Sequence, residues 1–400
     1  MHMKITDIPK EGIGPLQGLK VVVAGGATAG PFAGTMMSDF GASVIHIESP
    51  AMFDTNRLAD AYEQDHRNQR GLALDVPSPK GKEIFAKLIK DTDIFIESSK
   101  GGQWAKWGLT DEALWEINKA LVIVHVSGFG QEGDPEYIKR PSWDGVGLAF
   151  GGITFQNGSP ETPLNIGPYF CDGITAMYAS WGALAAVIHA KKTGQGESLD
   201  IAQFEPMIRS QSGGPYRYFQ YGIVPKRLGS KNNIAAAFRN FKCSNGYIFI
   251  GLAGPAILPK GLAFFGYEIG TPGFPKGFLV PQGTPQAEML ENTIAEYCAQ
   301  RTVEEVDAAL VELGVPCAPL MTYEMARNNS HYKAREVFTE WETREGKTVF
   351  GVNCLPRMKN NPGRVWNGAP GWGEDTRDIL EELGFCAEDI DALYEAKVVR

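Results

Sequence analysis

The first half of the chain alternates short apolar runs with amphipathic segments, and this alternation restricts the fold more than any other feature. Each apolar run is bounded by glycine or polar residues, and the segments between the runs have the apolar period of a helix. Repeated strand–helix–strand units build a parallel sheet that is covered by helices. The pattern predicts strands at residues 19–26, 43–49, 72–76, 93–98 and 121–130, and helices at residues 31–41, 78–91 and 110–118.

The pattern changes after about residue 222, which indicates a second folding unit. Asn245-Gly246 lies between two strand-like runs, and this dipeptide is the strongest short signal for a β-hairpin. Thr302 and Glu305 have the spacing of a capping box at the start of a helix. The elements predicted here and in the last part of the chain are hairpins at 240–252 and 341–353, and helices at 284–300, 302–313, 375–384 and 387–396.

A chain of 400 residues exceeds the size of one ordinary hydrophobic core, so two domains are expected. We predict an α/β fold with a Rossmann-like, parallel-sheet large domain built from both chain ends, residues 1–222 and 335–400. A smaller central α/β domain would cover residues 223–334.

Composition and charge exclude several classes of function. The net charge is −9, so a broad nucleic-acid-binding face is not expected. The six cysteines form no CxxC pair and none has zinc-ligand spacing to a histidine, which predicts reduced thiols, no metal site and a cytoplasmic location. No apolar run is expected to span a membrane, and residues 1–12 lack the apolar core of a signal peptide.

Three glycine-bearing turns follow predicted strands and would share one edge of a parallel sheet, where open α/β folds bind ligands. The first, residues 25–30, departs from the GxGxxG spacing. It is either a close strand–helix turn or, with Glu48 as a ribose-binding acid, part of a nicotinamide or nucleotide site. The second, residues 97–102, carries two hydroxyls, a lysine and two glycines, and is either a solvated loop or a phosphate site. The third turn is residues 127–131.

The segment 164–198 places Asp172 at the start of a long apolar helix that ends near Thr193. An aspartate at this position is either an N-cap, which accepts the free amides of the first helical turn, or an attacking carboxylate. The neighbouring Cys171 follows two aromatic residues, so we expect a buried structural thiol.

The segment 65–70, Asp-His-Arg-Asn-Gln-Arg, precedes a predicted strand. It is either a charged loop or a basic feature close to a bound anion. His66 and His125 have no partner that the sequence assigns, and both are expected to be structural.

Taken together, the segments resemble the family III CoA-transferases, and the resemblance covers nearly the whole chain. It is closest to the branch of the L-carnitine and bile-acid CoA-transferases, and ESSKGGQ with HVSGFGQEGDP favours the bile-acid members. The matching segments, in chain order, are GLKVVVAGGATAGPFAG, GASVIHIESP, HRNQRGLALDVPSPKGKEI, TDIFIESSKGG, VHVSGFGQEGDP, PYFCDGITAMYASWGALAA with TGQGESLDIAQFE, and NNPGRVWNGAPGWGEDTRDILEELGF.

The resemblance implies that Asp172 is the catalytic nucleophile and that Lys100 binds the phosphates of CoA, with Lys106 in a similar role. The further residues expected to contact CoA are Ser98, Ser99, Leu74, Asp75, Val76, Thr28 and Ala29. The candidates for an oxyanion or acyl pocket are Gly128, Phe129, Gly130 and Tyr169.

The sequence departs from the family pattern at three positions. Trp107 replaces a second arginine of the carnitine branch, and Pro50 stands where some members place an arginine. Ala176 replaces the glycine that usually follows the aspartate by four residues.

The resemblance implies an interlocked homodimer in which two subunits thread through each other as rings. It also implies a reaction that moves CoA from an acyl-CoA to a free carboxylic acid through an aspartyl anhydride and an aspartyl-CoA thioester. The partners would be CoA, acyl-CoA and a small carboxylic acid, without a further cofactor, nucleic acid or membrane.

Two questions stay open at this point. The acid is either carnitine-like or bile-acid-like. An acyl-CoA hydrolase or an α-epimerase on the same fold is the alternative activity, although Ser127 stands where the epimerising branch has its histidine.

Overall fold

The computed structural model describes residues 13–400, so the signal-peptide expectation lies outside the described part. The chain divides into two compact units. The first unit comprises Met1–Gly152, Gly167–Gln211 and His331–Arg400, and the second comprises Ile153–Ile166 and Ser212–Ser330.

The boundaries drawn from the sequence were residues 222 and 335. They differ from the observed units at 153–166, 212–222 and 331–334. These short stretches carry no strong apolar period, so the sequence offers little to assign them to one unit or the other.

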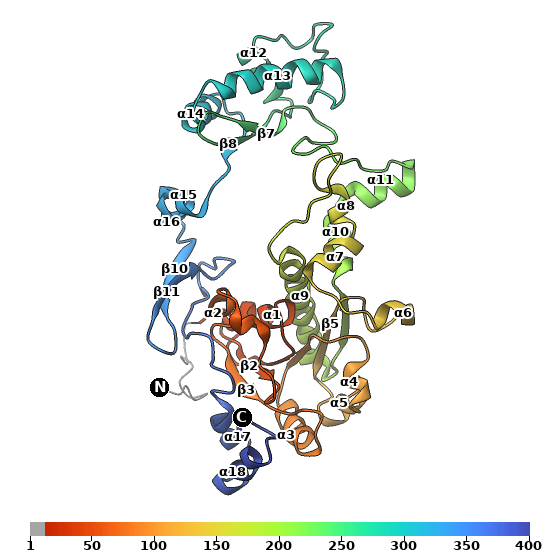
Figure 1. Cartoon of the computed structure of the whole chain (residues 1–400), viewed down its shortest axis with the longest axis vertical. Coiled ribbons are helices and arrows are strands. Elements are labelled where there is room, and N and C mark those ends of the chain that lie inside the picture. Colours follow the sequence, from red (N-terminus) through yellow and green to blue (C-terminus); the bar gives the residue numbers. More distant parts are fainter. Residues whose placement is uncertain (1–12) are drawn as a thin grey trace. The chain divides into compact units, whose positions relative to one another are not determined.

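A parallel sheet forms the centre of the first unit (Figure 1). Its order, β3-β2-β1-β4-β5-β6, is the strand order of the Rossmann fold, and it reverses between β1 and β4. The predicted parallel sheet is therefore confirmed. The third strand begins at residue 70, earlier than predicted, because Arg70 and Gly71 already pair with the second strand. The strands are β1 (Lys20–Ala24), β2 (Ser43–Glu48), β3 (Arg70–Ala73), β4 (Ile94–Glu97), β5 (Val122–Ser127) and β6 (Ser198–Ala202).

Helices cover both faces of this sheet because successive strand residues point to opposite sides. Val21 and Val23 lie in one apolar cluster with residues of α1 and α9, whereas Val22 lies in the other cluster with residues of α3, α5, α17 and α18. The bounds are α1 (Ala29–Ser38), α9 (Phe170–Thr193), α3 (Pro79–Ile89), α5 (Asp111–Ile117), α17 (Thr376–Glu382) and α18 (Ala387–Glu395). The last two helices come from the end of the chain.

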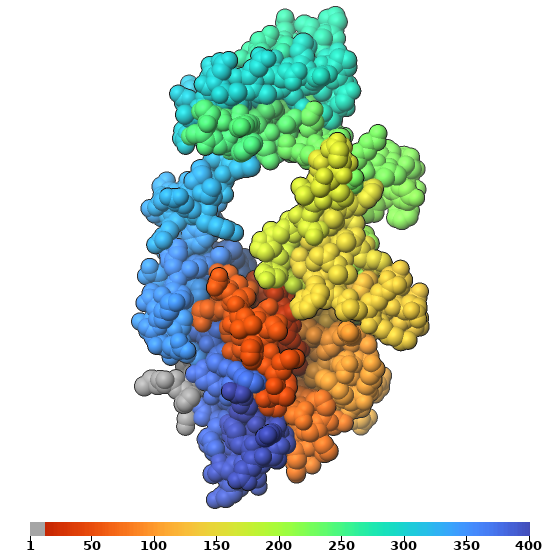
Figure 2. All heavy atoms as spheres, in the orientation of Figure 1, coloured from red at the N-terminus to blue at the C-terminus, as the bar shows by residue number. Residues whose placement is uncertain are grey.

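The segment 66–70 is buried and binds residues that are distant in sequence. Arg67 forms a two-pronged ion pair with Asp39, and Arg70 forms another with Glu382. Both sequence interpretations, a charged loop and a basic feature near an anion, are therefore wrong, because the arginines are buried and pair with carboxylates of the chain itself. In Figure 2 the last residues of the first unit, in blue, lie against the red and orange residues near its start.

Helix α9 is long and apolar enough to cross a membrane by length and composition, which corrects the expectation that no apolar run reaches that length. A core helix has the same property when it is packed between other elements. Ala176, Ala179 and Ala183 are fully buried in the cluster that α9 shares with α1 and the sheet. A side chain at Gly182 would come within 2.5 Å of Leu199, so α9 lies close against β6.

The second unit contains an antiparallel sheet of order β7-β8-β9 covered by helices. The predicted hairpin is confirmed, because Lys242 pairs with Tyr247 on either side of Asn245-Gly246. The capping box of Thr302 and Glu305 is confirmed as well. The elements are β7 (Phe238–Lys242), β8 (Tyr247–Gly251), β9 (Cys317–Pro319), α12 (Leu258–Phe264), α13 (Pro285–Ala299) and α14 (Val303–Glu312).

The predicted hairpin near residue 341 is also present, as β10 (Phe338–Glu342) and β11 (Thr348–Val352). Most helices that the sequence did not indicate have seven residues or fewer, too few to establish an apolar period. They are η2 (Thr55–Leu58), α2 (Tyr62–Asp65), α4 (Gln103–Lys106), α6 (Pro135–Ile138), α7 (Asp144–Phe150), α8 (Ile153–Gln156), α10 (Phe204–Ser210), α15 (Tyr323–Asn328) and α16 (Ser330–Ala334); the longer α11 covers Gly213–Tyr221.

Candidate active site

A cleft of about 700 Å³ in the first unit is lined by the turns that follow β1, β4 and β5. The turns after β1 and β4 separate where the strand order reverses, which is the usual ligand position in open α/β sheets. Asp172 and Gly128 line the cleft. So do most residues that were expected to contact CoA, namely Ala29, Leu74, Asp75, Val76, Ser98, Ser99 and Lys100.

The glycine turn after β1 packs against the end of β4. Gly25 has a φ of +114°, and a side chain there would come within 2.5 Å of the Ser98 hydroxyl oxygen. A side chain at Gly30 would approach the same oxygen to 2.9 Å. These contacts support the close-turn interpretation. Thr28 is buried, accepts a hydrogen bond from Asn56 and is not among the residues that line the cleft.

Glu48 is engaged within the protein. One of its oxygens accepts hydrogen bonds from Arg57 and from the backbone N–H of Asp54, both at 2.9 Å, and the other pairs with the same guanidinium. A carboxylate held in this way is not available to a ribose, which removes the acid on which the nicotinamide alternative rested.

Lys100 and Arg140 are the cations of the cleft lining. Lys100 follows Ser99, whose hydroxyl accepts a hydrogen bond from the Trp104 indole at 3.2 Å. The guanidinium of Arg140 lies 4.0 Å from the ring centre of Tyr137. Lys106 is exposed and is not part of the lining. Arg140 was not identified from the sequence, because it lies in a loop between two short helices without a recognisable motif.

Asp172 occupies the third position of α9 and does not cap the helix. The N-cap residue is Tyr169, in the left-handed conformation with a φ of +52°. The Asp172 side chain is 5% exposed, and its Oδ1 accepts a hydrogen bond of 2.5 Å from the Gln203 amide nitrogen. The N-cap interpretation is therefore wrong, and the carboxylate lines the cleft.

The surroundings of Asp172 disfavour its charged form. Burial is the largest cause, and the negative charge of Asp144 adds to it, whereas the hydrogen bond from Gln203 acts in the opposite direction. The net result raises the pKa of Asp172 from 3.8 to about 7. Asp144 is close because its Oδ1 accepts a 3.1 Å hydrogen bond from the backbone N–H of Asp172. A carboxyl with a strongly raised pKa in a cleft is a common property of active sites.

A chain of hydrogen bonds positions this carboxylate. Ser142 donates to the Gln203 side-chain oxygen at 2.9 Å, which directs the amide nitrogen of Gln203 toward Asp172. Gly128 makes room for Ser142, because a side chain at Gly128 would come within 2.1 Å of the Ser142 Cβ. The sequence did not indicate Gln203, Ser142 or Asp144. They reach Asp172 only through the packing of α7, α9 and α10.

Of the pocket residues predicted in the turn after β5, Gly128 lines the cleft, whereas Phe129 and Gly130 do not. The N–H of Gly130 already donates to the Ser127 hydroxyl at 2.8 Å, so it is not a free oxyanion donor. Gly130 and Phe129 line a separate hollow of about 380 Å³ in the first unit. Tyr169 is 47% exposed and lines neither space. Gly128 is therefore the member of this predicted set that the structure places beside Asp172 in the cleft lining.

His125 is bound between two carboxylates and is not part of the cleft lining. Its ring nitrogens lie 2.8 Å from Glu97 and 2.9 Å from Asp111. Burial lowers the pKa of His125, but the two carboxylates outweigh burial and raise it to about 9. The expected structural role is supported, and this histidine is not placed to exchange an α-proton of a substrate in the cleft.

Cys171 is a buried thiol, as expected. Burial is the largest of the causes that raise its pKa to about 12, so the thiol stays protonated. Its sulfur donates toward the Gln203 carbonyl at 3.4 Å, and a side chain at Gly147 would come within 2.5 Å of it. The thiol fills the contact between α7 and α9.

Comparison with known proteins identifies the family of the chain. The sequence model of the CoA-transferase family III matches residues 16–376. The chain is 42% identical over 392 residues to the bile acid CoA-transferase BaiK of Clostridium scindens (strain JCM 10418 / VPI 12708), which covers 97% of this chain and 89% of that protein.

Solved structures show the same fold. A CAIB/BAIF family protein from Brucella suis superposes with a TM-score of 0.79 at 27% identity, over 93% of this chain and 100% of that one. Rv3272 from Mycobacterium tuberculosis superposes with a TM-score of 0.77 at 20% identity, over 92% of this chain and 99% of that one.

Proposed function

Because the chain belongs to the family III CoA-transferases and is a CoA-transferase, we propose that Asp172 is its nucleophile and that the acceptor is a bile-acid-like carboxylic acid. The observation that carries the first part is the buried Asp172 carboxylate in the cleft, held by Gln203. The alternative of a carnitine-like acceptor shares the nucleophile and differs only in the acid.

In the proposed reaction, the Asp172 carboxylate attacks the thioester carbonyl of the donor and forms a mixed anhydride, which releases the CoA thiolate. The thiolate then attacks the aspartyl carbonyl of the anhydride. The donor acid departs as its carboxylate, and an aspartyl-CoA thioester forms on the enzyme. The acceptor carboxylate attacks this thioester, which forms a second mixed anhydride and releases the CoA thiolate. The thiolate then attacks the acceptor carbonyl, which gives the new acyl-CoA and frees the Asp172 carboxylate. Each step exchanges one activated acyl bond for another, so the exchange requires neither ATP nor a cofactor.

The tetrahedral intermediates need hydrogen-bond donors. The N–H of Gly173 already donates to the Tyr169 carbonyl at 2.9 Å within the helix, so it is a poor candidate. We propose the N–H of Gly128 for this role, since Gly128 lines the cleft together with Asp172. Loss of one such donor typically lowers kcat by about 100-fold or more.

The two cations of the cleft suit the phosphates of CoA. We propose that Lys100 and Arg140 neutralise them, with Arg140 supplying the charge that Trp107 does not. The rest of the lining includes large apolar side chains, and an apolar wall suits a broad ring system better than a small zwitterion. Its large apolar members are Ile47, Met52, Phe53, Leu74, Trp104, Trp107, Ile138 and Trp143.

We further propose that the protein is a homodimer. Helix α9 leaves Met177, Trp181 and Ile188 exposed by 50%, 71% and 60%, and these residues follow one another along one side of the helix. An exposed apolar stripe on a central helix is typical of a subunit interface. Trp181→Glu should shift the protein to monomers in analytical ultracentrifugation, and an unchanged mass would contradict this interface.

A transfer assay followed by mass spectrometry tests the function. Bile-acid, carnitine-type and short aliphatic acyl-CoAs are each offered with each free acid, to the wild type and to Asp172→Ala. We expect a new acyl-CoA with a bile-acid acceptor, and loss of it in the variant. Substantial transfer by the variant would exclude Asp172 as the nucleophile. Preference for carnitine would exclude the proposed acceptor, and release of free CoA alone would indicate a hydrolase.

A further inference from the structure

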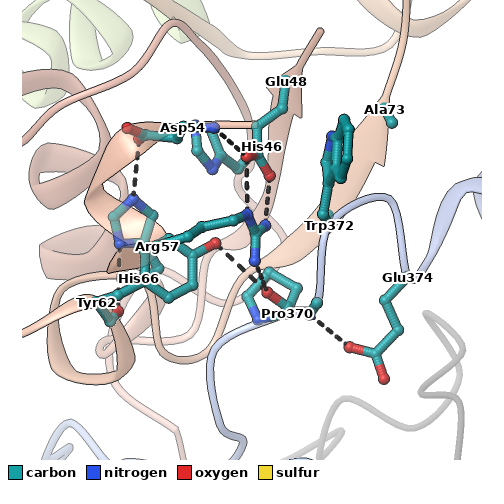
Figure 3. A network of polar contacts seen from close by, with 12 residues as sticks. His46, Glu48, Asp54, Arg57, Tyr62, His66, Ala73, Pro370, Trp372 and Glu374 are labelled. Atoms are coloured by element: carbon teal, nitrogen blue, oxygen red, sulfur yellow. Dashed lines mark hydrogen bonds and ion pairs between the residues drawn. The ribbon is translucent and has the colours of Figure 1, made fainter. Parts of the chain in front are cut away.

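We infer that His46, Asp54 and His66 form a binding site for a divalent transition-metal ion beside the glycine turn of β1. Within residues 13–400 this is the group of three buried side chains whose potential ligand atoms all lie within 4.8 Å of one another. Figure 3 shows the two imidazoles and the carboxylate turned toward one another. His46 is on β2, His66 follows α2, and Asp54 caps η2.

The hydrogen bonds of the two histidines fix which ring nitrogens are free. His46 Nε2 lies 2.8 Å from the carbonyl oxygen of Gly25, and His66 Nδ1 lies 3.3 Å from the carbonyl oxygen of Tyr62. A carbonyl oxygen only accepts, so each of these nitrogens carries the proton. In the neutral form of each ring, the opposite nitrogen, His46 Nδ1 or His66 Nε2, presents a lone pair, as a metal ligand must.

Both lone-pair nitrogens are buried and have no hydrogen-bond partner in the described part of the chain. Both rings have an exposed fraction of 0%. The Asp54 carboxylate faces them, with its Oδ2 at 3.9 Å from His66 Nε2, which is too long for a hydrogen bond. With both rings neutral, two nitrogen lone pairs and a carboxylate oxygen face one another, an arrangement that a cation stabilises.

The ligand set and its support are those of a metal site. Two imidazoles and one carboxylate suit zinc and the neighbouring divalent ions. A ligating histidine usually donates its second N–H to a backbone carbonyl or a carboxylate, which orients the ring, and both rings have such a partner here. Metal–ligand bonds of about 2.1 Å require the three groups to close by roughly 1 Å, which small side-chain rotations provide.

A bound ion would act on the cleft through the glycine turn. Asp54 accepts hydrogen bonds from the backbone N–H of Ala27 at 3.1 and 3.2 Å, and His46 holds the carbonyl of Gly25. Both residues of the turn line the cleft. The site is therefore structural: it would fix the position of the turn without contacting the reacting atoms, and it does not depend on the proposed acceptor.

The test measures metal directly in the full-length, untagged protein. After equilibration with Zn²⁺ and removal of free ion, elemental analysis should find about one ion per chain in the wild type and below about 0.2 in His66→Gln and in Asp54→Asn. His189→Gln removes an exposed histidine of α9 and should bind as the wild type does. Zinc should raise the Tm of the wild type and of His189→Gln only.

One further measurement needs no substitution, in case a variant fails to fold. In the Cu²⁺-loaded wild type, pulsed electron paramagnetic resonance should detect the remote nitrogens of coordinated imidazoles. A wild type that holds less than about 0.2 ion per chain, equal binding by His66→Gln, or a copper signal without imidazole coupling would each overturn the site. In those cases the space between the three groups holds water or a proton.

Discussion

Asp172→Asn should make the protein more stable while it abolishes transfer, and the gain in stability should grow with pH. The pKa of Asp172 is 3.8 in an unperturbed chain and about 7 in the folded protein. The folded state therefore holds this proton more tightly than the unfolded chain. The resulting stability is complete below pH 3.8 and is lost as pH rises through about 7.

The size of the effect follows from the same two values. Each pKa unit corresponds to 1.36 kcal/mol, so ionisation of Asp172 destabilises the folded wild type by about 4 kcal/mol at pH 7 and above. Asparagine removes the charge but keeps a side-chain oxygen that accepts the hydrogen bond from Gln203. The free energy of unfolding of Asp172→Asn should thus equal that of the wild type near pH 4 and exceed it by about 4 kcal/mol at pH 8.

Urea unfolding followed by tryptophan fluorescence measures this difference. All eight tryptophans belong to the first unit, so the signal reports the unit that contains the site. Glu112→Gln is a matched control, because Glu112 is an exposed acid in the first turn of another helix. The raised pKa of Asp172 is contradicted if Asp172→Asn is no more stable than the wild type at pH 8. It is also contradicted if the difference in unfolding free energy does not change with pH.

Four further substitutions test the proposed site and the ion pairs of His125. Asp144→Asn should lower the pKa of Asp172 and move the acid limb of kcat/KM to lower pH, whereas Gln203→Leu removes a hydrogen bond that favours the charged form and should move that limb to higher pH; equal shifts in one direction would contradict the assignment. Arg140→Ala should raise the KM for acyl-CoA about tenfold with little change in kcat, and an unchanged KM would remove it from the phosphate site. The folded pKa of His125 is about 9, against 6.5 unperturbed, so as pH rises from 6.5 to 9 the stability of the wild type should fall by about 3 kcal/mol more than that of His125→Gln; equal falls in the two proteins would contradict the ion pairs.

The sequence carried enough information to predict the sheet and the edge at which the cleft lies. Apolar runs such as 121–130 and helical periods such as 78–91 are local signals, and the structure has β5 and α3 there. The proposal that Asp172 is the nucleophile came from the resemblance, since an aspartate at a helix start is more often a cap. The structure excludes the cap, because Asp172 is the third residue of α9, after the N-cap Tyr169, and its carboxylate accepts a hydrogen bond from Gln203.

The features that the sequence could not predict arise where distant segments meet. Gln203 follows Asp172 by 31 residues, and its amide reaches the carboxylate only because α9 and α10 pack together. Arg70 belongs to a charged segment that looks like a solvated loop in the sequence. It is nevertheless only 1% exposed, because Glu382, from the end of the chain, pairs with it. No periodicity relates such residues, so burial and pairing of polar groups have to be read from the structure.

The setting of Asp172 combines two requirements that oppose each other. A carboxylate in water is a weak nucleophile, and burial beside Asp144 raises the pKa of Asp172 and with it the basicity of the oxygen that we propose attacks the thioester. The same burial favours the protonated carboxyl at neutral pH, and the hydrogen bond from Gln203 opposes it by favouring the charged form. A pKa of about 7 keeps roughly half of the enzyme ionised at neutral pH while its carboxylate stays more basic than an ordinary substrate acid. The neighbouring thiol of Cys171 cannot compete for the acyl group, because its pKa of about 12 leaves it protonated.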